Sequence, residues 1–186
     1  METEQVNAVA IAESWERIGA GEAEALSTLC QEIYAQHYLH LWYDNGLWYR
    51  QMRYSSAALE VELADAQTEF YWILRDSQKA GYLKLNLDAR PDARLFATST
   101  PGLEIERVYL YKACAGLGLG QKAMAWAETR ARQLQRAYVF LYTMDSSKAR
   151  LFYEKAGYLA RGVKRLDFEK MKPEYRGMYL MIKELP

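Results

Sequence analysis

The stretch Leu103-Glu-Ile-Glu-Arg-Val-Tyr-Leu-Tyr-Lys-Ala-Cys-Ala-Gly-Leu-Gly-Leu-Gly-Gln-Lys122 decides how this chain folds. Its first nine residues, up to Tyr111, are rich in aliphatic, aromatic and β-branched types, which predicts a β-strand. Beyond the glycines of this stretch, apolar residues at three- and four-residue steps predict a helix, namely Ala123, Met124, Ala127, Ala131 and Leu134. The sequence therefore predicts a strand, a glycine turn and the start of a helix.

The three glycines of the turn, Gly116, Gly118 and Gly120, leave backbone N–H groups bare at the start of this helix. Such a helix start, with the positive end of its dipole, is a place for a phosphate. A dinucleotide fold fits poorly, because the turn lies past the middle of the chain and the next suitable acid, Asp145, is about 25 residues on. A Walker loop is excluded because Gln121 follows the last glycine.

Two segments resemble motifs of the GNAT N-acetyltransferases. Residues 115–120 are similar to the Gln/Arg-x-x-Gly-x-Gly/Ala loop of that family, which grips the pyrophosphate of coenzyme A. The segment Ala149-Arg-Leu-Phe-Tyr-Glu-Lys-Ala-Gly-Tyr158 resembles the family's Ala-x-x-Phe-Tyr-x-x-x-Gly-Phe helix. With the preceding strand, these pieces stand in the family's order, and the resemblance covers about residues 102–163.

The predicted elements follow the GNAT order β-α-α-β-β-β-α-β-α-β-β in a single domain, residues 1–186. Strands are expected at 6–12, 69–74, 81–87, 103–111, 137–144, 158–163 and 175–184. Helices are expected at 22–37, from Ser55 or Ser56 to about 66, from the glycine turn to 134, and at 147–156. The resemblance implies an α/β fold with a mixed, mostly antiparallel sheet of about seven strands and four helices. It also implies a cofactor cleft where the fourth and fifth strands splay apart.

Composition indicates a globular protein and excludes several classes of function. Basic and acidic residues balance at 24 each, so nothing favours nucleic acid as a partner. No apolar run approaches the roughly 20 residues of a membrane span, and the N-terminus lacks a signal-peptide pattern. Two cysteines indicate reduced thiols, and His37 and His40 lack a third metal ligand. We expect a cytoplasmic protein without a metal.

Two acidic residues of the strand predicted at 103–111 are candidates for binding an amine and removing its proton. On a regular strand Glu104 and Glu106 share one face with Val108 and Leu110. In some family members a glutamate at the Glu104 position removes a proton from the amine, often through water, so the resemblance implies that Glu104 is the base. Glu106 would bind the substrate ammonium. The alternative is that both carboxylates sit on the solvated edge of a strand.

Tyr153 is the candidate general acid. The family places this tyrosine beside the sulfur of the cofactor, where a phenol can protonate the leaving thiolate. Adjacent helical residues lie about 100° apart, so Phe152 can enter the core while Tyr153 faces the cleft. The alternative is that Tyr153 is a second core ring.

The resemblance also implies the residues that hold acetyl-CoA. The backbone of the strand would pair with pantetheine and hold the acetyl carbonyl, and the glycine loop would cradle the pyrophosphate. The implied cofactor contacts are Val108, Tyr109, Leu110, Ala115, Gly116, Leu117, Gly118, Leu119, Gly120, Gln121, Ser146 and Lys155. Two of them depart from the family pattern, because Ala115 replaces the usual Gln or Arg and Ser146 replaces a frequent Asn.

Large aromatic residues gather in residues 40–50, which we expect to form a loop around the turn sequence Asp44-Asn-Gly46. Trp42 and Tyr43 are candidates for contacting the amine, because aromatic faces hold alkyl chains and cations. The other rings nearby are Trp48, Tyr49 and Tyr54. The alternative is that these rings fill the core or a dimer contact.

The interpretation is an acetyl-CoA-dependent N-acetyltransferase that acts on a primary amine by direct attack. The stretches at 81–86 and 103–110 resemble the PaiA-like polyamine acetyltransferases, which implies a polyamine or other small amine as the acceptor. Family members are often homodimers. One alternative is a protein N-terminal or lysine acetyltransferase, which would have an open groove. The other is a non-catalytic acyl-CoA-binding regulatory protein.

Overall fold

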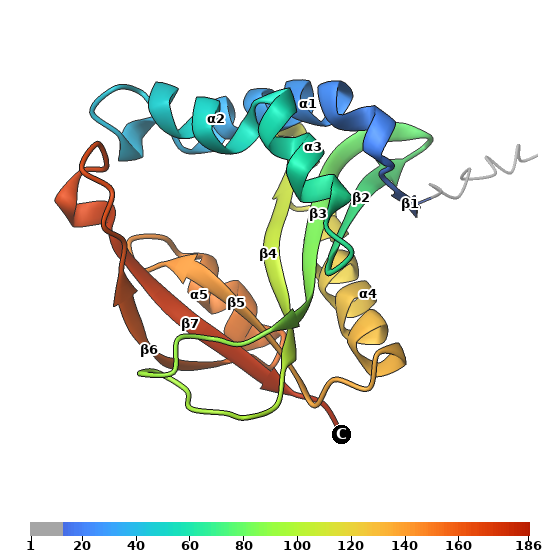
Figure 1. Cartoon of the computed structure of the whole chain (residues 1–186), viewed down its shortest axis with the longest axis vertical. Coiled ribbons are helices and arrows are strands. Elements are labelled where there is room, and N and C mark those ends of the chain that lie inside the picture. The colour runs from blue at the N-terminus through green and yellow to red at the C-terminus, as the bar shows by residue number, and fades with distance from the viewer. Residues whose placement is uncertain (1–12) are drawn as a thin grey trace, which may run out of the picture.

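The structure is a computed structural model that describes residues 13–186, and its centre is one seven-stranded sheet (Figure 1). The strands lie in the order β1-β2-β3-β4-β5-β7-β6. Every neighbouring pair is antiparallel except β4 and β5, which are parallel. The strands are β1 (Glu13–Arg17), β2 (Thr68–Arg75), β3 (Gln78–Ala89), β4 (Gly102–Leu110), β5 (Tyr138–Met144), β6 (Leu159–Arg165) and β7 (Gly177–Glu184).

Helices cover both faces of the sheet. The helices are α1 (Ala23–His37), α2 (Leu47–Tyr54), α3 (Ser56–Ala64), α4 (Leu119–Gln133) and α5 (Ala149–Lys155). One hydrophobic cluster joins α1, α2 and α3 to one face of β2 and β3, and a second joins α4 and α5 to the opposite face. In Figure 1, α1, α2 and α3 lie across one end of the sheet, while α4 runs beside β3 and β4. None of the helices in residues 13–186 has the length and apolar character that a bilayer crossing requires.

The predicted mixed sheet and its flanking helices are confirmed, with one additional helix, α2. The prediction of a loop at residues 40–50 was wrong at its end, because α2 begins at Leu47. The Asp44 carboxylate accepts hydrogen bonds from the backbone N–H groups of Gly46 and Trp48, at 3.0 Å each, which caps this helix start. The predicted turn therefore exists and opens a helix. The strand predicted at residues 6–12 lies outside the described residues.

A β-bulge interrupts the pairing of β3 with β4. Lys84 lies opposite Arg107, and Leu85 lies opposite Ile105, so Glu106 is the extra residue between them. A bulge of this kind shifts the alternation of side chains by one position. The alternation of side chains between the two faces of the sheet is therefore offset by one residue after Glu106.

The bulge corrects the expectation that Glu104 and Glu106 share a face with Val108 and Leu110. Val108 and Leu110 pack against the cluster of α4, as Ile105 does before the bulge. Glu106 instead forms an ion pair with Arg53 of α2 on the opposite face. The two carboxylates thus lie on the side of the sheet that carries the first three helices.

β4 and β5 separate soon after they begin to pair. Their register contains two pairs, Leu103 with Val139 and Glu104 with Phe140. Beyond Glu104, the β5-facing edge of β4 has no strand partner among residues 13–186. Figure 1 shows the two strands diverging toward the first three helices. The splay that the resemblance implied is therefore confirmed, and Glu104 marks the point where it begins.

Gly81 is required because β3 lies very close to the part of β4 that β5 does not pair with. A Cβ atom at this position would lie 2.1 Å from the carbonyl oxygen of Tyr109 and 2.9 Å from the Cα atom of Leu110. Both contacts are with backbone, which cannot rotate away. We expect Gly81→Ala to lower the free energy of unfolding by about 2 kcal/mol, measured by urea denaturation. Gly21→Ala is the control, since its Cβ would meet nothing within 4 Å, and equal effects in the two variants would contradict the argument.

Candidate active site

A cavity of about 330 Å³ occupies the space between the diverging strands. Its walls come from β4, β5, α5, residues 34–49, the connection between β6 and β7, and the start of β7. The lining residues are Tyr34, Tyr38, Leu41, Trp42, Tyr49, Ile105, Glu106, Val108, Tyr109, Leu141, Tyr142, Thr143, Met144, Ser147, Ala149, Tyr153, Leu166, Phe168, Met171 and Met178. Five residues predicted from the sequence thus meet in one cavity: Trp42, Glu106, Val108, Tyr109 and Tyr153.

Tyr153 reaches the cavity from α5. Its hydroxyl has no hydrogen-bond partner among residues 13–186, and burial raises its pKa well above the ordinary value of 10.0. The phenol is therefore protonated at neutral pH and free to donate. Phe152 lies 3.5 Å from the position that a Cβ atom of Gly120 would occupy, so it packs on the start of α4. Both rings also pack against the cluster of α4, but only Tyr153 lines the cavity.

The glycine turn leaves an open backbone cradle at the start of α4. Gly116 and Gly118 have φ angles of +77° and +79°, and a Cβ atom at either position would meet nothing within 4 Å. The first helical hydrogen bond runs from the N–H group of Lys122 to the carbonyl of Gly118, at 3.1 Å. The N–H groups of residues 119–121 thus have no acceptor within the helix. The arrangement fits an anionic group such as a pyrophosphate.

The other predicted cofactor contacts have different surroundings. Leu119 is buried and anchors the helix start, whereas Ala115, Leu117, Gln121, Ser146 and Lys155 are exposed. Ser147 lines the cavity in place of its neighbour Ser146, and its Oγ accepts a hydrogen bond from the N–H group of Ala149 at 3.1 Å. The contact of Ser146 with the cofactor stays a prediction.

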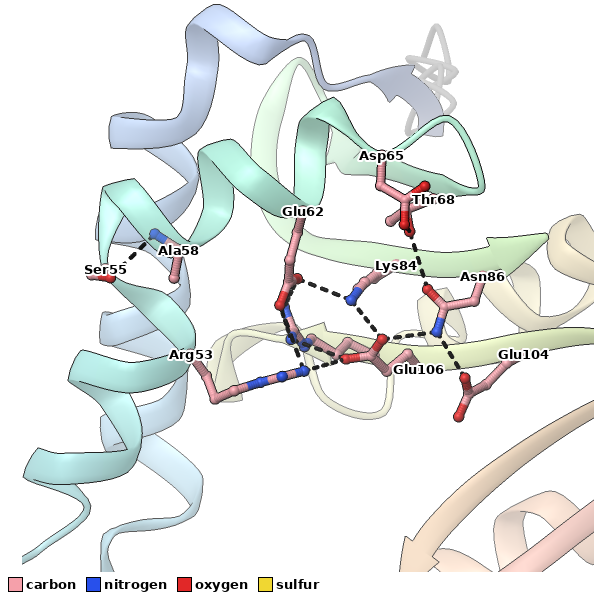
Figure 2. A network of polar contacts seen from close by, with 11 residues as sticks. Arg53, Ser55, Ala58, Glu62, Asp65, Thr68, Lys84, Asn86, Glu104 and Glu106 are labelled. Carbon is pink, nitrogen blue, oxygen red and sulfur yellow. Dashed lines mark hydrogen bonds and ion pairs between the residues drawn. The ribbon is translucent and has the colours of Figure 1, made fainter. Parts of the chain in front are cut away.

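Glu106 is held by a network of cations (Figure 2). Its carboxylate lies 2.5 Å from Lys84 Nζ, 2.8 Å from Arg53 and 2.9 Å from Arg107. Glu62 of α3 shares these three cations, at 2.9 Å from Lys84, 2.9 Å from Arg107 and 3.5 Å from Arg53. Lys84 and Arg107 are both buried, so each needs these carboxylates as partners. The network therefore ties β3 and β4 to α2 and α3.

The cations decide the protonation state of Glu106. Burial alone would raise its pKa, but the charges of Arg107 and Lys84, with hydrogen bonds from Lys84 and Asn86, lower it to about 2. A carboxylate with so low a pKa stays ionised and is a poor proton acceptor. Glu106 is thus suited to hold charge and position, and not to remove a proton from an amine.

Glu104 has the opposite character. Burial raises its pKa, the hydrogen bond from Asn86 lowers it, and the charge of Glu106 raises it, with a net rise above the ordinary 4.5. One oxygen accepts that hydrogen bond, and the other has no hydrogen-bond partner among residues 13–186. Glu104 does not line the cavity, but its neighbours Ile105 and Glu106 do.

The aromatic residues of the cavity wall also belong to the core. Trp42 is 2% exposed, donates a hydrogen bond from Nε1 to the hydroxyl of Tyr34 at 2.6 Å, and stacks on Tyr49 with ring centroids 4.7 Å apart. Tyr43 is 67% exposed and lies outside the cavity lining, so the structure does not bring it to the site. Trp42 and Tyr49 thus line the cavity and also pack in the core, and a contact of Trp42 with the amine stays a prediction.

Several residues of the wall were not predicted from the sequence. Tyr34 of α1 and Tyr38, which directly follows the end of α1, are four residues apart, and this spacing could have indicated a shared aromatic face. Phe168 and Met171 come from the charged connection between β6 and β7, where no local pattern indicates a site. They reach the cavity only because this connection folds back against Trp42.

Residues 13–186 contain no group of three His, Cys, Asp or Glu side chains placed to hold a metal ion. Cys30 and Cys114 are free. Cys30 is buried, and burial raises its pKa to about 12, so this thiol stays neutral. Neither cysteine lines the cavity.

The charge of Glu106 should contribute to stability in a pH-dependent way. Because its pKa is lowered from 4.5 to about 2, the contribution is present above pH 4.5 and is lost as the pH falls through 2. We expect Glu106→Gln to lower the free energy of unfolding at pH 7 by about 3 kcal/mol, measured by urea denaturation. The difference from wild type should shrink between pH 4.5 and 2. Glu60→Gln, on the exposed face of α3, is the control, and a difference independent of pH would contradict the charge argument.

Comparisons with known proteins agree with this geometry. The profile of the Acetyltransferase (GNAT) family matches residues 24–158. An uncharacterized N-acetyltransferase in the pepI 3'region of Lactobacillus delbrueckii subsp. lactis is 35% identical over 97 residues, which are 52% of this chain and 54% of that protein. The chain thus spans about half the length of this curated relative.

Two solved structures share the fold at low identity. The PaiA N-acetyltransferase from Thermoplasma acidophilum, in complex with coenzyme A, is 16% identical, with a TM-score of 0.68 over 94% of this chain and 99% of that one. The spermidine/spermine N-acetyltransferase SpeG from Vibrio cholerae, in mutant form, is 13% identical, with a TM-score of 0.63 over 92% and 93%. With the family profile covering more than half of its length, this chain belongs to the GNAT acetyltransferase family.

Proposed function

We propose that this chain transfers an acetyl group from acetyl-CoA to a small primary amine by direct attack. The observation that carries the proposal is the unpaired edge of β4, which borders a cavity with an aromatic wall. A bare strand edge can bind an extended chain through backbone hydrogen bonds, as an added strand would. Acetyl-CoA has an extended pantetheine arm and a pyrophosphate, and both features have a counterpart here.

The residues that would hold the cofactor follow from this placement. The N–H groups of residues 119–121 would bind the pyrophosphate, and Gly116 and Gly118 allow it to approach the backbone. The backbone of Val108, Tyr109 and Leu110 would pair with pantetheine. Bound acetyl-CoA supplies an activated acyl thioester. The backbone near Val108 then supplies the donor for the oxyanion.

Proton transfers are assigned to Glu104 and Tyr153. Glu104 takes the proton of the amine, because its raised pKa makes it the better acceptor of the two β4 carboxylates. Since Glu104 does not line the cavity, a water molecule carries the proton to it. Tyr153 donates its proton to the departing sulfur. No acyl-enzyme is proposed, because neither cysteine reaches the cavity.

A small amine suits this cavity better than a peptide does. The connection between β6 and β7 packs Phe168 against Trp42 and Tyr49 and adds Phe168 and Met171 to the cavity wall. A wall built from several segments favours a small acceptor over a peptide in an open groove. Aromatic faces can hold an alkyl chain or a cation. Together with the resemblance to PaiA-like enzymes, this makes a polyamine the acceptor to test first.

The non-catalytic alternative has less support. Ala115 and Ser146 depart from the family pattern, but both side chains are exposed and the backbone cradle beside Ala115 is intact. A cofactor-binding protein without activity has no need for a free phenol beside the cavity. The cytoplasmic location and the homodimer stay predictions.

The first test is the release of thiol from acetyl-CoA with and without spermidine. We expect spermidine-dependent release, and Tyr153→Phe should lower kcat about 100-fold because the sulfur then leaves without an acid. Acetyl-CoA should still raise the melting temperature of this variant. Tyr138→Phe, whose hydroxyl donates to the Thr100 carbonyl outside the cavity, is the control. A fully active Tyr153→Phe variant would remove Tyr153 as the acid, and no release with any amine would support the regulatory alternative.

The second test concerns the base. Glu104→Gln should lower kcat about 100-fold or more at pH 7, because solvent then has to deprotonate an amine whose pKa lies near 10. The pH optimum should move upward, toward the pKa of the amine itself. Glu16→Gln on the edge strand β1, far from the cavity, is the matched control. An unchanged pH–rate profile would rule out Glu104 as the base.

A further inference from the structure

Asn86 joins the two carboxylates of β4. It lies on β3 directly opposite Glu104 in the register of the two strands. Its Nδ2 atom donates to Glu104 Oε2 at 2.7 Å and to Glu106 Oε2 at 2.9 Å. Figure 2 shows Glu104 at the end of the network, linked to it through Asn86. One amide group thus connects the candidate base to the ion-pair network.

We propose that Asn86 is a positioning residue for the acetyl transfer: its NH2 group holds the Glu104 carboxylate beside Glu106 and keeps it available as a proton acceptor. The inference rests on the proposed function, because it assigns a role in the same reaction. Asn86 does not line the cavity between β4 and β5, and its NH2 group donates to the two carboxylates, so it acts through Glu104.

The orientation of the Asn86 side chain follows from its partners. An amide NH2 group has two hydrogens, and two carboxylates are here to receive them, one each. The reversed amide would direct its carbonyl oxygen at both carboxylates, which is repulsive. In the observed orientation, this oxygen lies 3.4 Å from the hydroxyl of Thr68, which can donate to it.

Glu106 is an immobile hydrogen-bond partner for Asn86. Lys84, Arg53 and Arg107 surround its carboxylate from β3, α2 and β4 itself, and Lys84 and Arg107 are buried. A carboxylate bound to three cations cannot rotate freely. Asn86 therefore connects Glu104 to a group that is already immobile, and it leaves the second oxygen of Glu104 free for a proton.

The groups around Glu104 determine whether its pKa rises or falls when the hydrogen bond from Asn86 is lost. Glu106 on β4 disfavours its ionised form, whereas Lys84 on β3 and Lys164 on β6 favour that form. Tyr142 on β5 also faces it and is neutral near pH 7. The hydrogen bond from Asn86 favours the ionised form more than either lysine does. Its loss leaves burial and the repulsion from Glu106 less opposed, so the pKa of Glu104 rises.

Other side chains at position 86 would not do the same work. Leucine has a similar size but no donor, and aspartate would add a third carboxylate beside two others. Serine and threonine have a single donor hydrogen, which can reach only one of the two carboxylates. The pairing of one NH2 group with two acidic groups is therefore specific to an amide at this point of β3.

The experiment compares Asn86→Leu with Thr68→Val, which removes the weaker contact on the other side of the same amide. The side-chain carboxyl of Glu104 is titrated by 13C NMR in the free protein, with Glu104→Gln to assign its signal. We expect its pKa to rise by about one in Asn86→Leu, since hydrogen bonds to charged groups are the strong ones. Thr68→Val should change it little.

Activity provides the second readout. The acid limb of the kcat/KM profile should move upward by the same amount, so that kcat/KM below this limb falls about tenfold while the value at high pH approaches wild type. The KM for acetyl-CoA should stay unchanged. If Asn86→Leu does not fold, Asn86→Asp has the same shape and should raise the pKa of Glu104 further, because it adds a negative charge.

Two results would overturn the role of Asn86: a Glu104 titration that does not move in Asn86→Leu or Asn86→Asp, or an equal movement in Thr68→Val. Failure of the proposed function has a different signature. A wild-type chain that releases no thiol with any amine contradicts the acetyl transfer, whereas an unmoved titration in an active chain contradicts only the assignment of Asn86.

Discussion

The site depends on one constraint, which is that β4 loses its neighbour β5 after Glu104. A strand edge in the interior of a protein needs partners for its N–H and C=O groups, because buried backbone groups without partners are costly. Here the sheet does not supply them, and the edge borders a cavity instead. The divergence therefore creates both the space for a ligand and the hydrogen-bonding surface that selects an extended one.

The bulge at Glu106 gives the two acidic residues of β4 different environments. Without it, Glu104 and Glu106 would stand two residues apart on a regular strand, in surroundings of the same kind. With it, Glu106 is the unpaired residue and lies among Arg53, Lys84 and Arg107, while Glu104 pairs with Asn86. Their pKa values consequently move in opposite directions from the same starting value. Pairs of titratable groups separated in this way are typical of active sites.

Local patterns predicted much of this arrangement. The glycine turn and the Phe152–Tyr153 pair each consist of residues close together in the chain, so their spacing can be recognised in the sequence. In the structure, the turn lies at the start of α4, and Tyr153 lines the cavity. The bulge left no local signal, because it depends on how β3 and β4 align. Lys84 has no local signal either, because only the fold buries it between two carboxylates. The same bulge explains why the predicted face of Val108 was wrong.

The aromatic wall links the choice of acceptor to the stability of the fold. Trp42 and Tyr34 line the cavity, and they also form part of the core between the first three helices and the sheet. Removing such a ring would enlarge the cavity, but it would also remove packing worth roughly 3–5 kcal/mol in comparable cores. Residues that contribute less to this core, such as Phe168 on the connection between β6 and β7, can change with a smaller loss. Variation in acceptor size should therefore arise first in this connection, while the rings of α1 remain as they are.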